Sequence, residues 1–139
     1  MATRSNDQSI NPPDLTRAEE EVMQILWKLG KGFVNDVLEH YAEPRPAYNT
    51  VSTIIRILEK KGFIDHQAYG KTHEYFPLIS KQDYTRQFMG NVFKGYFDNS
   101  FNKMVSFFTG DESMTMKEME EIRSIIDRQI QQKKAKNNE

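Results

Sequence analysis

Apolar and polar residues alternate with a helical period in three consecutive segments of the first half of the chain. The clearest segment is residues 47–64, where apolar side chains are spaced i, i+3, i+4, i+7 and polar side chains occupy the opposite face. Similar apolar spacing over residues 16–29 and 33–41 predicts two preceding helices. The apolar positions of the third segment are Val51, Ile54, Ile55 and Leu58.

Helix-end signals and a hairpin pattern complete this half. Residues 16–19, Thr-Arg-Ala-Glu, fit a capping box, and Gly30 and Gly62 suit helix ends. Pro46 suits the first turn of the third helix. Residues 63–68 and 72–76 predict two strands around a turn at Tyr69-Gly70-Lys71. Three helices followed by a hairpin predict a winged helix-turn-helix domain.

The second half of the chain predicts further helices and no strands. Apolar and aromatic residues repeat at helical spacing from residue 84 to 108 and again after a capping box at residues 115–118. The expected fold is therefore mainly α with a small β-wing. We divide the chain into a flexible leader (1–13), a winged-helix DNA-binding domain (14–79), a helical dimerisation domain (80–132) and a flexible tail (133–139).

The C-terminal helices carry more apolar surface than they can bury by themselves, because so short a segment has too much surface for its volume. The simplest way to bury this surface is a dimer interface with a second copy of the chain across a two-fold axis. Such a dimer would also supply the second recognition helix that a twofold-symmetric DNA-binding protein needs. The alternative is a monomer whose helices fold back on the winged helix. The predicted dimer contacts are Phe88, Val92, Phe97, Phe101, Met104, Ile122 and Ile126.

Charge is unevenly distributed on a chain with a formal net charge of −1. Residues 14–43 hold three basic and seven acidic residues, whereas residues 45–71 hold five basic and two acidic ones. A local basic patch suits modest phosphate contact. The absence of cysteine excludes disulfides and thiolate chemistry and suits the cytoplasm. No apolar run is long enough for insertion into a membrane.

The polar face of the third helix and the wing hold the candidate DNA contacts. We expect Asn49, Thr50, Ser52 and Thr53 to reach base edges. Arg56, Lys60 and Lys71 are expected to contact phosphates, and His73 is also carried toward the backbone by the wing. A solvated helix face is the alternative for such a pattern on an isolated helix.

With these elements in order, the chain resembles the penicillinase-repressor family of β-lactamase and methicillin-resistance regulators. The similarity runs from about Leu15 to Lys133. It is carried by residues 15–19 (LTRAE), 22–23, 26–27, 47–53 (AYNTVST), 58–62 (LEKKG) and 75–79 (YFPLI), and by the closing helix from Thr115.

The resemblance implies a homodimeric repressor that binds palindromic double-stranded operator DNA. It implies a recognition helix that begins at Tyr48, which is itself a further candidate DNA contact. It also implies a membrane-bound sensor protease as partner, and release by cleavage in the dimerisation region. The family's Asn-Phe cleavage pair falls on Ser106-Phe107, where the Phe is kept and the Asn is not. Ser52 and Ile57 replace residues that are often basic in the family. A copper-sensing branch uses cysteine pairs, which this chain lacks.

Other chemistry is weakly supported. His66 and His73 face each other across the predicted wing, and His40 lies apart; two imidazoles without a third ligand make a poor zinc site, so no metal or cofactor is expected. No phosphate loop or nucleophile motif is present, so we predict no enzyme activity. Two alternatives stay open: a dimeric regulator released by a small-molecule effector bound near residues 84–108, and a winged helix used for protein contact.

Overall fold

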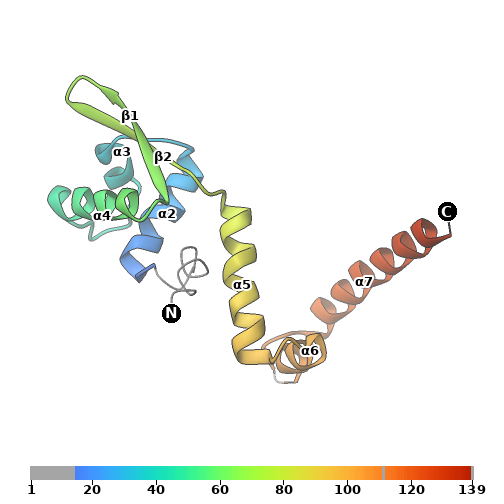
Figure 1. Cartoon of the computed structure of the whole chain (residues 1–139). Coiled ribbons are helices and arrows are strands. Elements are labelled where there is room, and N and C mark those ends of the chain that lie inside the picture. Colours follow the sequence, from blue (N-terminus) through green and yellow to red (C-terminus); the bar gives the residue numbers. More distant parts are fainter. Residues whose placement is uncertain (1–14, 111, 139) are drawn as a thin grey trace, which may run out of the picture. The chain divides into compact units, whose positions relative to one another are not determined.

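The computed structural model describes residues 15–110 and 112–138; the predicted leader, residues 1–13, lies outside them. Two compact units are present, one reaching Gly90 and the other starting at Asn91. The order along the chain (Figure 1) is α2 (Arg17–Leu29), α3 (Val34–Glu39), α4 (Tyr48–Lys60), β1 (Ile64–Tyr69), β2 (Thr72–Pro77), α5 (Lys81–Phe97), α6 (Phe101–Thr109) and α7 (Met116–Asn137). The predicted fold class, mainly helical with a two-stranded wing, is confirmed.

The first unit is built around the buried face of α4. Val51, Ile55 and Leu58 are fully buried and pack with apolar side chains of α2, α3 and the hairpin. Each such side chain contributes about 1.5–3 kcal/mol relative to an exposed one. The other buried members of this core are Val22, Met23, Leu26, Val34, Val37, Ile64 and Tyr75.

The hairpin is antiparallel and is joined by the two residues Gly70 and Lys71. Gly70 has φ 65°, a left-handed conformation that glycine adopts without steric cost. The amides and carbonyls of Gly32 and Tyr75 pair at 2.8–2.9 Å, which joins the segment before α3 to β2. The wing is therefore held to the helices by main-chain hydrogen bonds as well as by the core.

The start of α5 belongs to the first unit. Tyr84 is buried, with its ring centroid 5.4 Å from Trp27 and 6.3 Å from Phe63. The indole of Trp27 donates a 2.8 Å hydrogen bond to the carbonyl of Ile79, which satisfies the polar end of a partly buried ring. The first compact unit thus ends at Gly90, whereas the sequence placed a domain boundary near residues 78–80. Tyr84, which lies past that boundary, is buried against rings of the first unit.

α3 spans Val34–Glu39, shorter than the expected 33–41, and two other helix limits also differ from the expectation. α4 begins at Tyr48 with Ala47 as its N-cap, so Pro46 precedes the helix instead of lying in its first turn. α7 continues to Asn137, so that residues 133–137 of the expected tail are helical. In both cases the local signal was compatible with either assignment, because proline tolerates positions before a helix and lysine-rich sequence is a good helix former.

The second unit holds the end of α5, with α6 and α7. Rings cluster at the α5–α6 turn, where the Phe93 and Phe101 centroids lie 4.4 Å apart and those of Phe97 and Phe107 lie 5.6 Å apart. The turn itself uses left-handed backbone at Asp98 and Asn99. The predicted capping box at the start of α7 is confirmed. Among the described residues of this unit no side chain is fully buried.

No helix within residues 15–110 and 112–138 combines the length and the hydropathy needed to cross a lipid bilayer.

A buried ion pair joins the start of α2 to the end of α4. Glu19, which is 5% exposed, accepts hydrogen bonds from Lys61 Nζ at 2.8 Å and from the amide of Thr16 at 2.9 Å. Burial raises the pKa of Glu19, but the hydrogen bonds and the positive charge of Lys61 outweigh it, so the pKa lies below its ordinary value.

We expect Glu19→Gln to lower the free energy of unfolding at neutral pH by about 1–2 kcal/mol, because a charge-assisted hydrogen bond is replaced by a neutral one. With a lowered folded-state pKa, this contribution is present above the unfolded-state pKa and is lost as the pH falls through the folded-state pKa. Urea denaturation of both proteins across acidic pH measures it. The difference should shrink on acidification, and Glu21→Gln, an exposed carboxylate on the same helix, should show little difference at any pH.

Candidate nucleic-acid interface

The polar face of α4 is exposed opposite the core. Asn49, Thr53, Arg56 and Lys60 are all solvent-exposed, while Val51, Ile55 and Leu58 are buried on the other side. The amphipathic pattern predicted from the sequence is therefore confirmed for this helix. It leaves amide, hydroxyl and cationic groups available on a rigid element of 13 residues.

The N-terminus of α4 also offers donors. Ala47 is the N-cap and makes no side-chain hydrogen bond to the helix. First-turn amides of a helix lack partners within the helix, and they favour anions such as phosphate oxygens. The residues that carry these amides, Tyr48, Asn49 and Thr50, are exposed.

A groove of about 610 Å³ lies between α4, the start of α3 and the wing. It brings together five of the nine predicted contact residues: Tyr48, Ser52, Arg56, Lys71 and His73. The other four, Asn49, Thr50, Thr53 and Lys60, are exposed on α4 but do not line this groove. The helix thus presents two adjacent polar strips, one toward the wing and one away from it.

The groove includes residues that the sequence analysis did not select. Asn35 on α3 and Thr72 at the start of β2 both line it, together with the aromatic rings of Phe33 and Tyr75. Asn35 is exposed on the polar side of a short helix. Many surface residues share this sequence pattern, so the pattern alone does not identify Asn35 as a groove residue. Only the packing of α3 beside the wing distinguishes it.

The polar groups of the groove are partly ordered by their neighbours. The Arg56 guanidinium donates to the Ser52 hydroxyl at 3.3 Å, which directs this side chain along α4 toward the groove. The Asp36 carboxylate accepts from the amide of Phe33 at 2.9 Å and so caps α3. Cationic side chains from the helix and the wing, Arg56 and Lys71, therefore share one concave surface with the carboxylate of Asp36, which is hydrogen-bonded to the backbone.

Tyr75 closes the inner wall of the groove. Burial, and then the nearby charge of Glu59, raise the pKa of the Tyr75 phenol, although Arg56 opposes the shift. The phenol therefore stays neutral at physiological pH. The predicted approach of His66 and His73 across the wing is confirmed, with ring centroids 4.0 Å apart and planes 7° from parallel.

This unit is a winged-helix domain whose third helix and wing border one groove. A sequence model of the family described as penicillinase repressor matches residues 15–128. The chain belongs to the penicillinase repressor family.

Two named relatives match over nearly their whole length. The methicillin resistance regulatory protein MecI of Mammaliicoccus sciuri is 32% identical over 83% of this chain and 94% of that protein. The penicillinase repressor of Bacillus licheniformis is 26% identical over 88% of this chain and 96% of that protein. Among solved structures, the solution structure of the DNA-binding domain of the repressor BlaI matches with a TM-score of 0.45 and 30% identity, covering 51% of this chain and 88% of that chain.

Proposed function

We propose that the protein is a homodimeric transcriptional repressor that binds palindromic operator DNA and controls antibiotic-resistance genes of the β-lactamase type. The observation that carries this proposal is the exposed polar face of α4 beside a wing with Lys71 and His73, in a chain of the penicillinase repressor family. A helix of this kind fits the major groove, while a wing can follow the adjoining backbone. The names of the relatives, which refer to methicillin resistance and penicillinase, support the choice of target genes.

Direct readout is assigned to short polar side chains on α4. Asn49, Thr50, Ser52 and Thr53 lie in its first two turns, where the N-terminal part of a recognition helix approaches base edges. Arg56, Lys60, Lys71 and His73 are assigned to phosphates, and Tyr48 to the point where the helix enters the groove. Ile57, 39% exposed, is available for apolar contact in place of a charged one.

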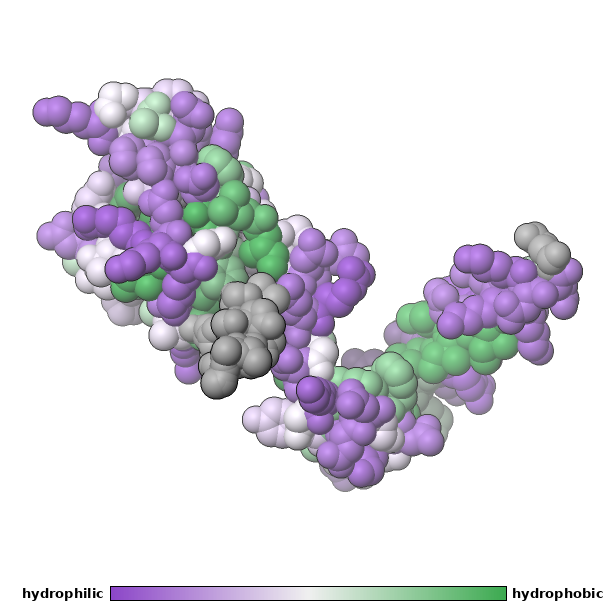
Figure 2. All heavy atoms as spheres, viewed as in Figure 1, coloured by the Kyte–Doolittle hydropathy of each residue, from purple (hydrophilic) through white to green (hydrophobic). Residues whose placement is uncertain are grey.

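Dimerisation is assigned to the C-terminal helices. Phe101 is 68% exposed and Ile126 is 49% exposed, and a band of hydrophobic surface follows α7 (Figure 2). Met119, Ile122, Ile126 and Ile130 form a helical stripe that matches the narrow seam of paired helices. Phe88, by contrast, lies in the first unit beside Tyr84, with ring centroids 6.3 Å apart. The other assigned contacts are Phe88, Val92, Phe97 and Met104.

Release is assigned to proteolysis at Ser106-Phe107 by a membrane-bound sensor protease. Both residues lie in α6 and are exposed, and Phe107 contacts the rings of Phe97 and Phe108. A protease binds extended backbone, so α6 must unwind locally before cleavage. The cut would separate α7 from the rest of the chain and weaken the dimer.

Two variants separate base contact from phosphate contact. Lys71→Ala should weaken binding to all duplexes about equally and reduce the slope of log K against log salt by about 1. Thr53→Ala should relax the sequence preference at one position of each half-site, because a hydroxyl contact to a base edge is lost. Fluorescence anisotropy on duplexes selected from a random pool, and on scrambled duplexes, measures both effects.

Lys28→Ala is the matched control for charge, because this exposed lysine lies on α2 outside the groove. It should leave affinity nearly unchanged. If Lys71→Ala altered the sequence preference and Thr53→Ala did not, the assignment of the two contacts would be reversed.

Ile126→Glu should weaken the dimer at least tenfold, about 1.4 kcal/mol, because a carboxylate replaces a side chain that a partner covers. Sedimentation velocity at micromolar concentration measures the change. Ser124→Glu adds the same charge to the opposite side of α7 and should leave the dimer intact. A wild-type chain that sediments as a monomer at this concentration would contradict the proposed assembly.

Exposure of the host to a cell-wall antibiotic should produce a fragment that ends at Ser106, visible by immunoblotting. Ser106→Asn, which restores the amide of the family's pattern, should increase the rate of cleavage, because a pocket built for an amide regains a hydrogen bond. Intact protein alongside derepressed target genes would rule out cleavage as the means of release.

A further inference from the structure

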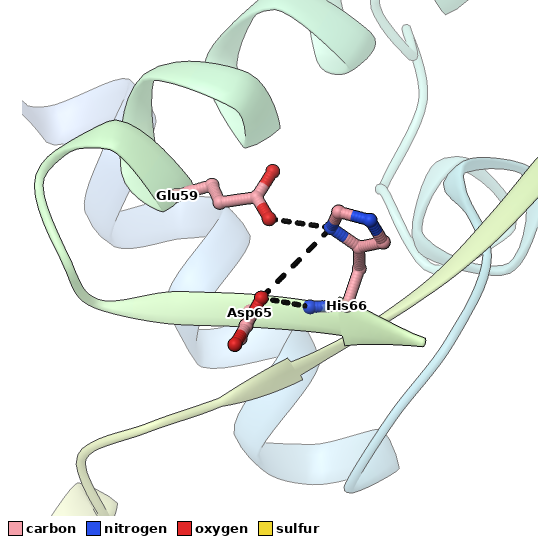
Figure 3. Close-up of side chains that lie close together, drawn as sticks. All are labelled: Glu59, Asp65 and His66. Atoms are coloured by element: carbon pink, nitrogen blue, oxygen red, sulfur yellow. Dashed lines mark hydrogen bonds and ion pairs between the residues drawn. The ribbon is translucent and has the colours of Figure 1, made fainter. Parts of the chain in front are cut away.

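Three potential metal ligands converge where α4 meets the wing (Figure 3). Glu59 comes from the last turn of α4, and Asp65 and His66 are consecutive residues of β1. One ligand atom from each residue lies within 4.8 Å of the other two. The loop through Gly62, which has φ 89°, turns the chain sharply enough to bring these elements together.

The distances suit a small cation. His66 Nδ1 lies 2.5 Å from Glu59 Oε2 and 3.9 Å from Asp65 Oδ1. Ligand atoms of a tetrahedral zinc ion, with bonds of about 2.0–2.1 Å, are separated by about 3.3 Å. The two observed distances bracket this value. The Oδ1 atom of Asp65 also accepts a 2.8 Å hydrogen bond from the amide of His66, which holds it beside the imidazole.

The charges of the cluster balance a divalent ion. Two carboxylates and a neutral imidazole carry a charge of −2, and the guanidinium of Arg56 on α4 is hydrogen-bonded to Ser52. The side chains of Glu59 and His66 are 27% and 28% exposed, whereas that of Asp65 is 57% exposed. An ion would thus be partly shielded while remaining open to water on one side.

The orientation of the His66 ring is supported from outside the cluster. His73 stacks on it with parallel planes, and Tyr75 lies 5.6 Å away between ring centroids. Because the nitrogen lone pairs of stacked rings lie in parallel planes, His73 supports the ring of His66 and does not share its ion. This stacking restricts rotation of the His66 imidazole.

We propose that Glu59, Asp65 and His66 bind a divalent transition-metal cation such as Zn²⁺, with water completing the coordination shell. The imidazole nitrogen favours zinc over the oxygen-seeking ions Mg²⁺ and Ca²⁺. The ion replaces the Glu59–His66 hydrogen bond, linking the last turn of the recognition helix to the first strand of the wing. This site is additional to the proposed DNA contacts and requires neither a dimer nor an operator.

Calorimetric titration of the metal-free full chain with Zn²⁺, without DNA, tests the proposal. We expect one ion per chain, and at least about tenfold weaker binding by His66→Gln and by Glu59→Gln, since each loses one of three ligands. His40→Gln is the matched control, because this exposed histidine on the far end of α3 lies outside the cluster. The His40→Gln variant should bind Zn²⁺ as tightly as the wild-type chain does. Co²⁺ in place of Zn²⁺ should give the visible absorption of a four-coordinate site.

Circular dichroism of each metal-free variant establishes that it is folded. If a variant at Glu59 or His66 fails to fold, Asp65→Asn takes its place, because Asp65 is the most exposed of the three ligands. Zinc affinity unchanged in the folded cluster variants would overturn the proposal, as would the absence of zinc binding by the wild-type chain. Since DNA is absent from the experiment, either result is independent of the proposed repressor function.

Discussion

The burial of one face of α4 is the interaction on which the first unit depends. Val51, Ile55 and Leu58 pack against side chains of α2 and α3, and Ile64 and Tyr75 extend the same core into the hairpin. Because these contacts fix the rotation of α4 about its own axis, they also fix which side chains face away from the core. The polar face and the groove beside the wing are consequences of that packing. A loosened core would therefore disturb the candidate interface as well as the stability.

The second unit, in contrast, leaves much of its apolar surface exposed. Its rings gather at the α5–α6 turn, yet no described side chain there is fully buried, and α7 carries a continuous apolar stripe. Exposed apolar surface of this kind costs free energy in water and favours association. A protein that reads DNA with one winged helix gains affinity and register when a second copy is linked to it. The first unit thus buries its apolar core, whereas the second leaves much of its apolar surface exposed.

The loop between α4 and β1 has two consequences for chemistry. It carries Lys61, whose ammonium group meets the buried Glu19 of α2, and it brings Glu59 beside Asp65 and His66. The first contact closes the core at the start of α2, where the pKa of the carboxyl is held low. The second gathers unlike ligands at the base of the wing. Both follow from the turn at Gly62, whose left-handed backbone suits glycine.

The sequence alone determined the element order, the capping boxes at Thr16 and Thr115, the buried face of α4 and the hairpin, because periodicity and turn chemistry are local properties. It also carried the family resemblance. Tertiary structure alone decided that Tyr84 joins the first core, that Asn35 and Thr72 line the groove, and that Glu59 lies beside His66. Residues 133–137, which the sequence left as tail, are helical. These features depend on which surfaces meet across the chain, and no local pattern encodes the distance between residues that are brought together only by the packing of separate elements.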